Sequence, residues 1–245
     1  MTPTFSAGQR WLPRTFAAIA LLALGACAPL EKQSPEYQAG RARVALPAGT
    51  WEDLGRSNEV IPLLPAGFED NQIPLQTRAV GLRGAQKELL AVLLVQTNRT
   101  NYPREQVRWS AGCPLEMEVT VVDATKGSRV RADCLRVKHW LAGTKWLEKD
   151  QPGLAKWLGS HQIALAQPYT YVGYRYTTEG GALVVVDALV DHRLLRPKPR
   201  DNQEFLRSDQ PAQWWSRELA QAARVSAGMM DGYLAIPPFP VPQTP

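Results

Sequence analysis

The chain has 245 residues, of which 44% are hydrophobic and 21% are charged. These proportions are close to those of ordinary globular proteins, so they exclude disorder throughout and predict a hydrophobic core. The formal net charge is +5, and it falls by two, to +3, without Arg10 and Arg14, which lie in a segment that we expect to be removed. Because no dense run of Lys and Arg accompanies this small excess, we do not expect binding to nucleic acid.

The first 26 residues have the organisation of a secretory signal. Arg10 and Arg14 are followed by an apolar stretch, 16–24, and then by small residues, and no acidic residue is present. The apolar stretch is about half as long as the roughly 20 residues that a membrane-spanning helix needs. We therefore predict a signal peptide over residues 1–26 and no permanent transmembrane helix there.

The motif Leu24-Gly25-Ala26-Cys27 at the end of this segment resembles the lipobox of bacterial lipoproteins. In that family the cysteine thiol is acylated and the chain is cut just before it. The resemblance thus implies a lipid anchor on Cys27, in which each buried CH₂ group contributes about 0.8 kcal/mol. Ala28 stands where an Asp tends to retain such proteins at the inner membrane, so the resemblance favours the periplasmic side of the outer membrane. The alternative is an ordinary cleaved signal with a chance cysteine nearby.

Composition divides the remaining chain into three segments. Residues 27–49 are polar with several prolines, which is typical of a tether. Residues 50–236 carry the apolar patterns of a single domain, and residues 237–245 contain five prolines. Proline prevents both a helix and a central strand, so we expect an extended tail there. A packed or frayed end and a docking peptide for a proline-binding partner are both open for this tail.

Three pairs of β-patterned stretches are separated by short polar turns, which predicts three hairpins. The third is the clearest, because Gly180 and Gly181 supply the positive φ that a tight turn needs. Residues 91–95 are apolar on both faces and predict a central strand that is covered on both sides. The paired stretches are 75–82 with 89–97, 116–122 with 129–137, and 169–177 with 183–190.

Two helical stretches accompany these strands. Pro152 should break or restart the first, over residues 144–159. The second is expected to begin at Ser208 or Asp209 and to end at Gly232. Its apolar stripe consists of Trp215, Leu219, Ala222, Ser226, Met229 and Tyr233. Together these elements predict an α+β fold, an antiparallel sheet built from hairpins and packed against a long C-terminal helix, with the helices on one face.

The two cysteines that remain beside Cys27 predict a structural disulfide. Cys113 and Cys134 flank the second hairpin, and an envelope protein folds in an oxidising compartment. A bond that closes such a loop stabilises a domain by roughly 3 kcal/mol. The alternatives are weaker, because a redox-active pair lacks the Cys-x-x-Cys motif and a metal site lacks neighbouring ligands.

No recognised catalytic motif is present in the chain. His139, His161 and His192 lie outside metal-ligand spacings, and there is no serine nucleophile elbow or phosphate-binding loop. Asp187, Asp191 and His192 form the only tight polar group, at the end of a predicted strand, where they are either surface charges or part of a site. We therefore expect no metal, no cofactor and no enzymatic activity, and we keep a hydrolase with an unrecognised site as an alternative.

Tyrosines are concentrated on one predicted strand. Tyr169 and Tyr171 point to one face of it, and Tyr174 and Tyr176 point to the other. They are either core anchors or, on one face, an exposed strip that stacks on sugar or peptide. The exposed strip is the candidate ligand site of a peptidoglycan- or carbohydrate-binding module.

The combined features favour a lipid-anchored, non-catalytic accessory protein of the bacterial envelope. Its expected partners are membrane lipid through Cys27 and another envelope protein or peptidoglycan. Residues 75–83 and 222–233 are also similar to stretches of uncharacterised proteobacterial lipoproteins, and this resemblance implies no particular activity.

Metabolic labelling with a fatty-acid analogue tests the anchor. We expect the mature protein to be labelled and to sediment with membranes, because the acyl chains partition into the bilayer. The Cys27→Ser variant should be unlabelled. Label retained in Cys27→Ser, or an unlabelled wild-type product in the soluble fraction, would contradict lipid attachment at Cys27.

Overall fold

A computed structural model of the chain describes residues 35–64, 72–100, 107–109, 112–164, 167–198, 200–203, 207, 209–229 and 232–242. The predicted signal peptide, Cys27 and residues 28–34 lie outside this described part. The elements are, in chain order, β1 (Glu36–Ala39), β2 (Ala42–Ala45), β3 (Thr50–Pro62), β4 (Gln72–Arg83), β5 (Leu89–Asn98), β6 (Thr120–Asp123), β7 (Ala132–Leu141), α1 (Lys145–Asp150), α2 (Pro152–Ser160), β8 (Tyr169–Thr177), β9 (Leu183–Asp191), α3 (His192–Leu195), α5 (Gln210–Gly228) and β10 (Leu234–Ala235). Among these described helices, none is both long and apolar enough to cross a bilayer.

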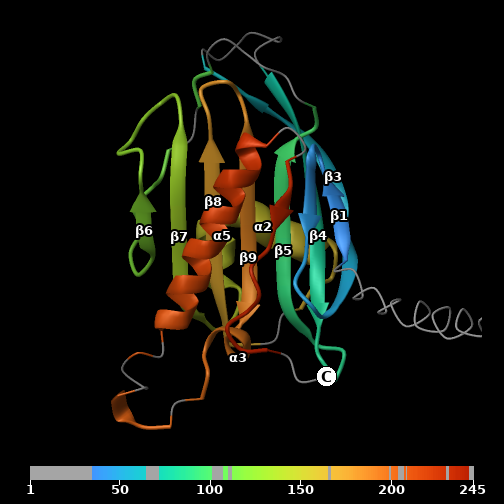
Figure 1. Ribbon diagram of the computed structural model, residues 1–245, viewed down its shortest axis with the longest axis vertical. Helices are drawn as coiled ribbons and strands as arrows, with labels where there is room; N and C mark the ends of the chain where they lie inside the picture. The colour runs from blue at the N-terminus through green and yellow to red at the C-terminus, as the bar shows by residue number, and fades with distance from the viewer. Residues whose placement is uncertain are drawn as a thin grey trace, which may run out of the picture. The chain divides into compact units, whose positions relative to one another are not determined.

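Seven strands form one antiparallel sheet in the order β3-β4-β5-β9-β8-β7-β6 (Figure 1). The three predicted hairpins are confirmed as β4–β5, β6–β7 and β8–β9. β5 pairs with β9 and not with β6. The chain therefore leaves the middle of the sheet after β5, builds the far edge with β6, and returns to the centre through β7 and β8. This order places residues 91–95 at the centre of the sheet, as their apolar pattern predicts.

A second, three-stranded sheet corrects the predicted tether. β1 and β2 form an antiparallel hairpin, and β10 joins β2 in parallel. Ala39 and Val44 of this hairpin are buried in the main core. Gly40 makes the turn possible, because its φ is +55° and an added Cβ would lie 2.3 Å from the backbone oxygen of Asn98. The prediction that residues 27–49 form a tether is therefore wrong from Glu36 onward.

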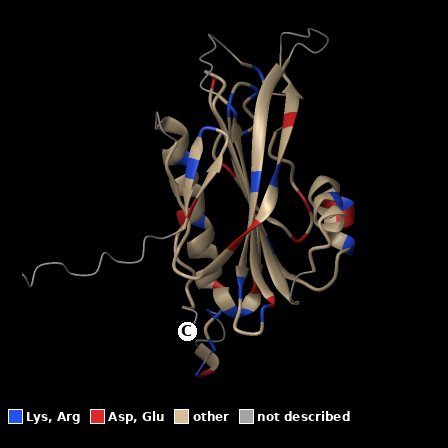
Figure 2. Ribbon diagram, turned by 90° about the vertical axis from the view of Figure 1, so that its right-hand side faces the viewer, with Lys and Arg blue, Asp and Glu red and all other residues tan. Residues whose placement is uncertain are grey.

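The central strands bury side chains on both faces, and helices cover both. Along β9, Val186 and Ala188 pack in the same cluster as α5, whereas Leu189 packs with Leu147 of α1 and Leu158 of α2. Figure 2 shows helices on the two sides of the sheet. The fold is thus α+β with an antiparallel sheet and a long C-terminal helix, but the expectation of helices on one face is wrong. A strand that is apolar on both faces needs a cover on each side to exclude water.

The first helical stretch is interrupted as predicted. α1 ends at Asp150, and α2 begins with Pro152, whose missing N–H does no harm in a first turn.

The long helix α5 begins close to its predicted start but ends earlier. Pro211 lies in the first turn, and Asp209 precedes the helix without a side-chain cap. The last helical residue is Gly228, not Gly232. Gly232 has a φ of +61°, and an added Cβ would lie 3.0 Å from Ala42, so this glycine serves the close approach to β2 and not the helix end.

The buried face of α5 is rotated slightly from the predicted stripe. Trp215, Leu219 and Ser226 are buried as predicted, whereas Ala222 is half-buried and Met229 is exposed. Alanines make most of the remaining contact, and their small size lets the helix approach the sheet closely. The buried residues of α5 are Ala212, Trp215, Ser216, Leu219, Ala220, Ala223, Ser226 and Ala227.

An aromatic stack holds the C-terminal segment against the domain. The Phe239 ring lies 5.2 Å from the Trp215 ring and 6.4 Å from the Trp51 ring, measured between centroids. The indole of Trp215 donates to the Pro237 carbonyl, and the backbone N–H of Val241 donates to the Leu194 carbonyl. The segment is extended as predicted, but residues 237–242 are packed, so this part of the predicted tail belongs to the domain.

We expect Phe239→Ala to lower the free energy of unfolding by about 2 kcal/mol. A fully buried Phe→Ala change costs about 3–5 kcal/mol, and Phe239 is only partly buried. Urea denaturation measures the change, and Pro242→Ala, at an exposed position in the same segment, is the matched control. Equal stability of Phe239→Ala and Pro242→Ala would show that the aromatic stack does not hold the segment.

Candidate functional site

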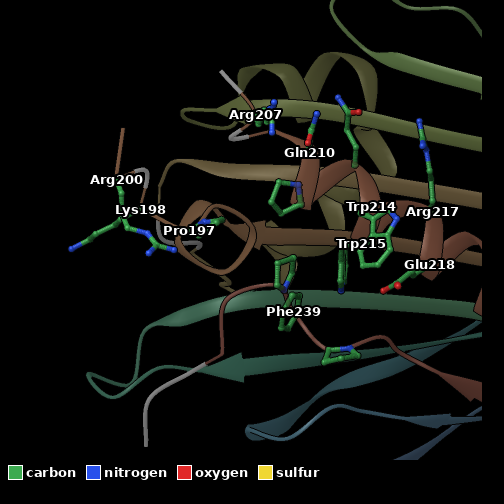
Figure 3. A pocket seen from close by; sticks show the side chains of 14 residues that line it. Pro197, Lys198, Arg200, Arg207, Gln210, Trp214, Trp215, Arg217, Glu218 and Phe239 are labelled. Carbon is green, nitrogen blue, oxygen red and sulfur yellow. The ribbon is translucent and has the colours of Figure 1, made fainter. Parts of the chain in front are cut away.

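A cleft of about 1000 Å³ lies at the end of the domain where α5 begins. Three parts of the chain build it, namely the segment after α3, the first turns of α5 and the C-terminal segment (Figure 3). This volume is at the upper end of the range for small-ligand sites. The lining residues are Pro197, Lys198, Arg200, Arg207, Gln210, Pro211, Gln213, Trp214, Trp215, Arg217, Glu218, Pro238, Phe239 and Pro240.

Two neighbouring tryptophans on α5 have opposite roles in this cleft. Successive helical residues are about 100° apart, so Trp214 and Trp215 point in different directions from α5. Trp215 is buried and forms the floor with Phe239, whereas 69% of Trp214 is exposed. A large ring that stays in solvent beside a cleft provides a flat apolar surface for a ligand.

The lining is rich in positive charge. Lys198, Arg200, Arg207 and Arg217 contribute cations, and Glu218 contributes the one carboxylate among the lining residues. All five side chains belong to exposed residues. Such an excess of cations in a concave surface attracts anions, and guanidinium groups bind phosphate or carboxylate oxygens through paired hydrogen bonds.

An ion pair holds one wall of the cleft. Arg196, just after α3, pairs with Asp209, which precedes α5. The Arg196 guanidinium also lies over the Trp140 ring, 5.8 Å from its centroid. Partial burial lowers the pKa of Arg196. These contacts connect the end of the central sheet with the start of α5, so the cleft is formed before any ligand binds.

The structure contradicts the exposed tyrosine strip. Tyr169, Tyr171 and Tyr174 are each at most 2% exposed, and Tyr176 is half-buried against the core. The alternation is as predicted, because Tyr169 and Tyr171 pack on the α1 and α2 side and Tyr174 on the α5 side. Since helices cover both faces of β8, neither pair is left in solvent, and the four tyrosines are core anchors.

Each fully buried tyrosine has a partner for its hydroxyl. Tyr169 donates to the Gly143 carbonyl at 2.9 Å, Tyr171 to Asp187 at 2.7 Å, and Tyr174 to Asp133 at 2.9 Å. Burial raises the pKa of Tyr169 to about 12. These hydroxyls therefore stay protonated and satisfy buried acceptors, as polar atoms in a core must.

Asp187 and Asp191 are engaged in separate contacts. Burial raises the pKa of Asp187, while the Tyr171 hydroxyl and the guanidinium of Arg136 act in the opposite direction. Asp191 accepts a hydrogen bond from the Arg193 backbone N–H at 2.7 Å and forms an ion pair with the Arg193 side chain at 2.9 Å. Asp191 thus caps α3 and anchors the side chain of Arg193, the second residue of the helix.

His192 lies in a largely apolar environment. Its ring meets the Trp140 ring edge-on at 4.4 Å, and neither ring nitrogen has a hydrogen-bond partner among the described residues. Burial, and then the positive charge of Arg196, lower the pKa of His192 to about 4. Neither His192 nor Asp187 nor Asp191 lines the cleft beside α5 or the three smaller clefts at residues 47–50, at Asp133 and at Val225. The structure therefore does not bring the predicted polar group together as a catalytic site.

The disulfide pair fastens a segment across the sheet. Cys113 and Cys134 form a disulfide in the structure, with Cα atoms 5.5 Å apart. Two acidic residues of the same segment form ion pairs with basic residues of β7, Glu116 with Arg136 and Glu118 with Lys138. Because Cys134, Arg136 and Lys138 alternate along β7, they share one face of the sheet. Residues 113–118 therefore lie along that face, held at three successive points.

Among the described residues, no group of three or more His, Cys, Asp or Glu side chains is placed to hold a metal ion. The cleft residues were not singled out from the sequence as a site. The signal that was present is the pair Trp214-Trp215 in an amphipathic helix, where Trp215 belongs to the predicted apolar stripe and Trp214 does not.

Replacement of His192 by Gln should flatten the pH dependence of stability in acid. The pKa of this histidine is about 6.5 in the unfolded chain and about 4 in the folded chain. As the pH falls from about 6.5 to about 4, the unfolded chain therefore binds a proton that the folded chain does not bind, and stability is lost. We expect the free energy of unfolding to fall by about 1–2 kcal/mol less in His192→Gln over this window.

Urea denaturation at pH 7 and pH 4.5 gives the difference, with exposed His161→Gln as the control. An unchanged pH dependence in His192→Gln would show that folding does not lower the pKa of His192.

Comparison with known proteins does not assign this chain to a family. No family model, curated protein or solved structure matches it. The site is therefore interpreted from the chain's own residues.

Proposed function

We propose that this chain is a lipid-anchored, non-catalytic binding protein of the bacterial envelope, and that the cleft beside α5 is its binding site for an anionic ligand. Acylated Cys27 attaches it to a membrane, with the periplasmic side of the outer membrane favoured. The observation that carries the proposal is the concave, cationic and aromatic lining of the cleft.

The composition of the cleft supports binding of a negatively charged partner. The exposed Trp214 ring provides apolar contact, and Lys198, Arg207 and Arg217 have no ion-pair partner among the described residues. Unneutralised cations beside a ring bind a ligand that carries both charge and apolar surface. The ring stack of Phe239 with Trp215 and Trp51 fixes one wall, so little ordering is needed on binding.

The fate of the candidate catalytic groups supports a non-catalytic role. Asp187 is buried under the Tyr171 hydroxyl, Asp191 caps α3, and His192 is held against Trp140 with a pKa of about 4. A general base must lie within hydrogen-bond reach of the substrate proton and have a pKa near the working pH. These groups instead serve the packing of the central strands.

In-cell photo-crosslinking tests this proposal. A photoreactive residue at Gln210, which lines the cleft, should give a specific adduct, whereas the same residue at Lys126, in the β6–β7 turn, should not. Adding Arg207→Glu and Arg217→Glu should reduce the Gln210 adduct about tenfold, because the anionic ligand is then repelled.

The matched control adds Lys156→Glu and Lys149→Glu, which make the same charge change on the opposite face of the sheet, on α2 and α1. Equal adduct yields from Gln210 and Lys126, or equal losses with both double replacements, would contradict a binding site in the cleft.

A further inference from the structure

A series of contacts connects Pro35, the first described residue of the chain, with the cleft. The Pro35 carbonyl accepts a hydrogen bond from the Leu46 backbone N–H at 3.1 Å. The next residue, Pro47, accepts a hydrogen bond from the Trp51 indole at 2.8 Å. The Trp51 ring stacks on Phe239, which lines the cleft.

A second, smaller cleft of about 440 Å³ lies between these two places. It is lined on one side by residues 47–50, which follow β2, and on the other by Pro238, Phe239, Val241 and Pro242. Phe239 lines both clefts. Residues 47–50, the smaller cleft and the cationic cleft therefore adjoin one another at this end of the domain.

The predicted lipid anchor, Cys27, is only a few residues before Pro35 in the sequence. Only residues 28–34 separate Cys27 from Pro35. Eight steps of at most about 3.6 Å give a reach of about 29 Å. β1 is part of the domain, so the tether is much shorter than the 23 residues, 27–49, that the sequence predicts. A tether of this length keeps Pro35 within about 29 Å of the bilayer surface.

The chemistry of this end suits a lipid surface. Trp214 is exposed, and tryptophan is the residue that membrane interfaces favour most together with tyrosine. Exposed prolines and the cations Lys198, Arg207 and Arg217 surround it. Clusters of Lys and Arg bind the phosphates of lipid headgroups, while an aromatic ring enters the headgroup region.

We infer that the cleft binds headgroup phosphates of the membrane that carries Cys27, so that the domain lies on the bilayer with the first turns of α5 toward the lipid. This inference rests on the anchor proposed above and names the ligand of the same cleft. Two contacts then hold the protein at the membrane, the acyl chains at Cys27 and the cationic cleft. The second contact orients the domain, which a flexible tether alone does not do.

Co-sedimentation with vesicles tests the headgroup site without the lipid anchor. The full chain after removal of the signal peptide, carrying Cys27→Ser, is mixed with vesicles of equal parts phosphatidylglycerol and phosphatidylcholine, or of phosphatidylcholine alone. We expect at least tenfold tighter binding to the anionic vesicles, and a loss of this preference as salt rises, because salt screens the charge attraction.

Charge reversal at matched sites localises the contact. The triple replacement Lys198→Glu, Arg207→Glu and Arg217→Glu should weaken binding to anionic vesicles at least tenfold. The same change of charge at Lys126, Arg129 and Arg131, in exposed positions around the β6–β7 turn at the other end of the sheet, should have little effect. All six residues are exposed, so both variants should fold, and circular dichroism checks this. Equal losses in the two variants would overturn the assignment to the cleft.

A depth readout distinguishes binding of the bilayer from binding of a soluble anion. Vesicles with brominated acyl chains should quench tryptophan fluorescence in the wild type and quench less in Trp214→Phe. Inorganic phosphate at millimolar concentration should not abolish binding of the chain to these vesicles. Saturation by inorganic phosphate together with absence of vesicle binding would overturn the inference in favour of a soluble ligand.

The vesicle experiments and the fatty-acid labelling test the headgroup site and the lipid anchor independently. Vesicle binding by the Cys27→Ser chain with no fatty-acid labelling of the wild type would remove the anchor and keep the cleft. Labelling of Cys27 without preference for anionic vesicles would keep the anchor and remove the headgroup site.

Discussion

Phe239 lies between Trp215 of α5 and Trp51 of β3, and this contact connects three parts of the chain that are far apart in sequence. It closes the end of the sheet where β4 turns into β5, and it holds the C-terminal segment beside the start of α5. The prolines around Phe239 favour an extended backbone, so little conformational entropy is lost when the segment packs. The cleft exists because this segment forms its wall.

The central sheet imposes a second constraint. β5, β9 and β8 are apolar on both faces, so each face needs a cover, and the few polar groups inside need partners. The Tyr171–Asp187 and Tyr174–Asp133 hydrogen bonds meet this need, one on each side of β8. Arg224 of α5 adds two bonds of 2.9 Å to Asp133, so one partly buried carboxylate connects the helix with the sheet. Asp187, which belonged to the predicted polar group, thus serves the packing of the central sheet.

The segment fastened to β7 shows how the far edge is completed. The disulfide of Cys113 and Cys134 and the ion pairs of Glu116 and Glu118 hold it in place, while Leu115 and Met117 point outward and are 87% and 90% exposed. Alternation between held and outward residues is what an extended chain produces on a pleated surface. Covering of this face is thus shared between α1, α2 and an irregular segment, and only the helical part has a recognisable periodicity.

Local patterns in the sequence were sufficient to predict the three hairpins, the break at Pro152, the long helix and the alternation of the tyrosines, because each depends on neighbours along the chain. The order of the strands, the helices on both faces, the β1–β2 hairpin inside the predicted tether and the packed C-terminal segment depend on contacts between distant residues. The candidate site also combines features that are visible in the sequence with features that only tertiary contacts create. The Trp214-Trp215 pair and the scattered cations are visible in the sequence, but the cleft at Lys198, Arg207 and Arg217 arises only when the segment after α3, the start of α5 and Phe239 meet in space. A linear pattern specifies which side chains are available, and the tertiary packing decides which of them share one concave surface.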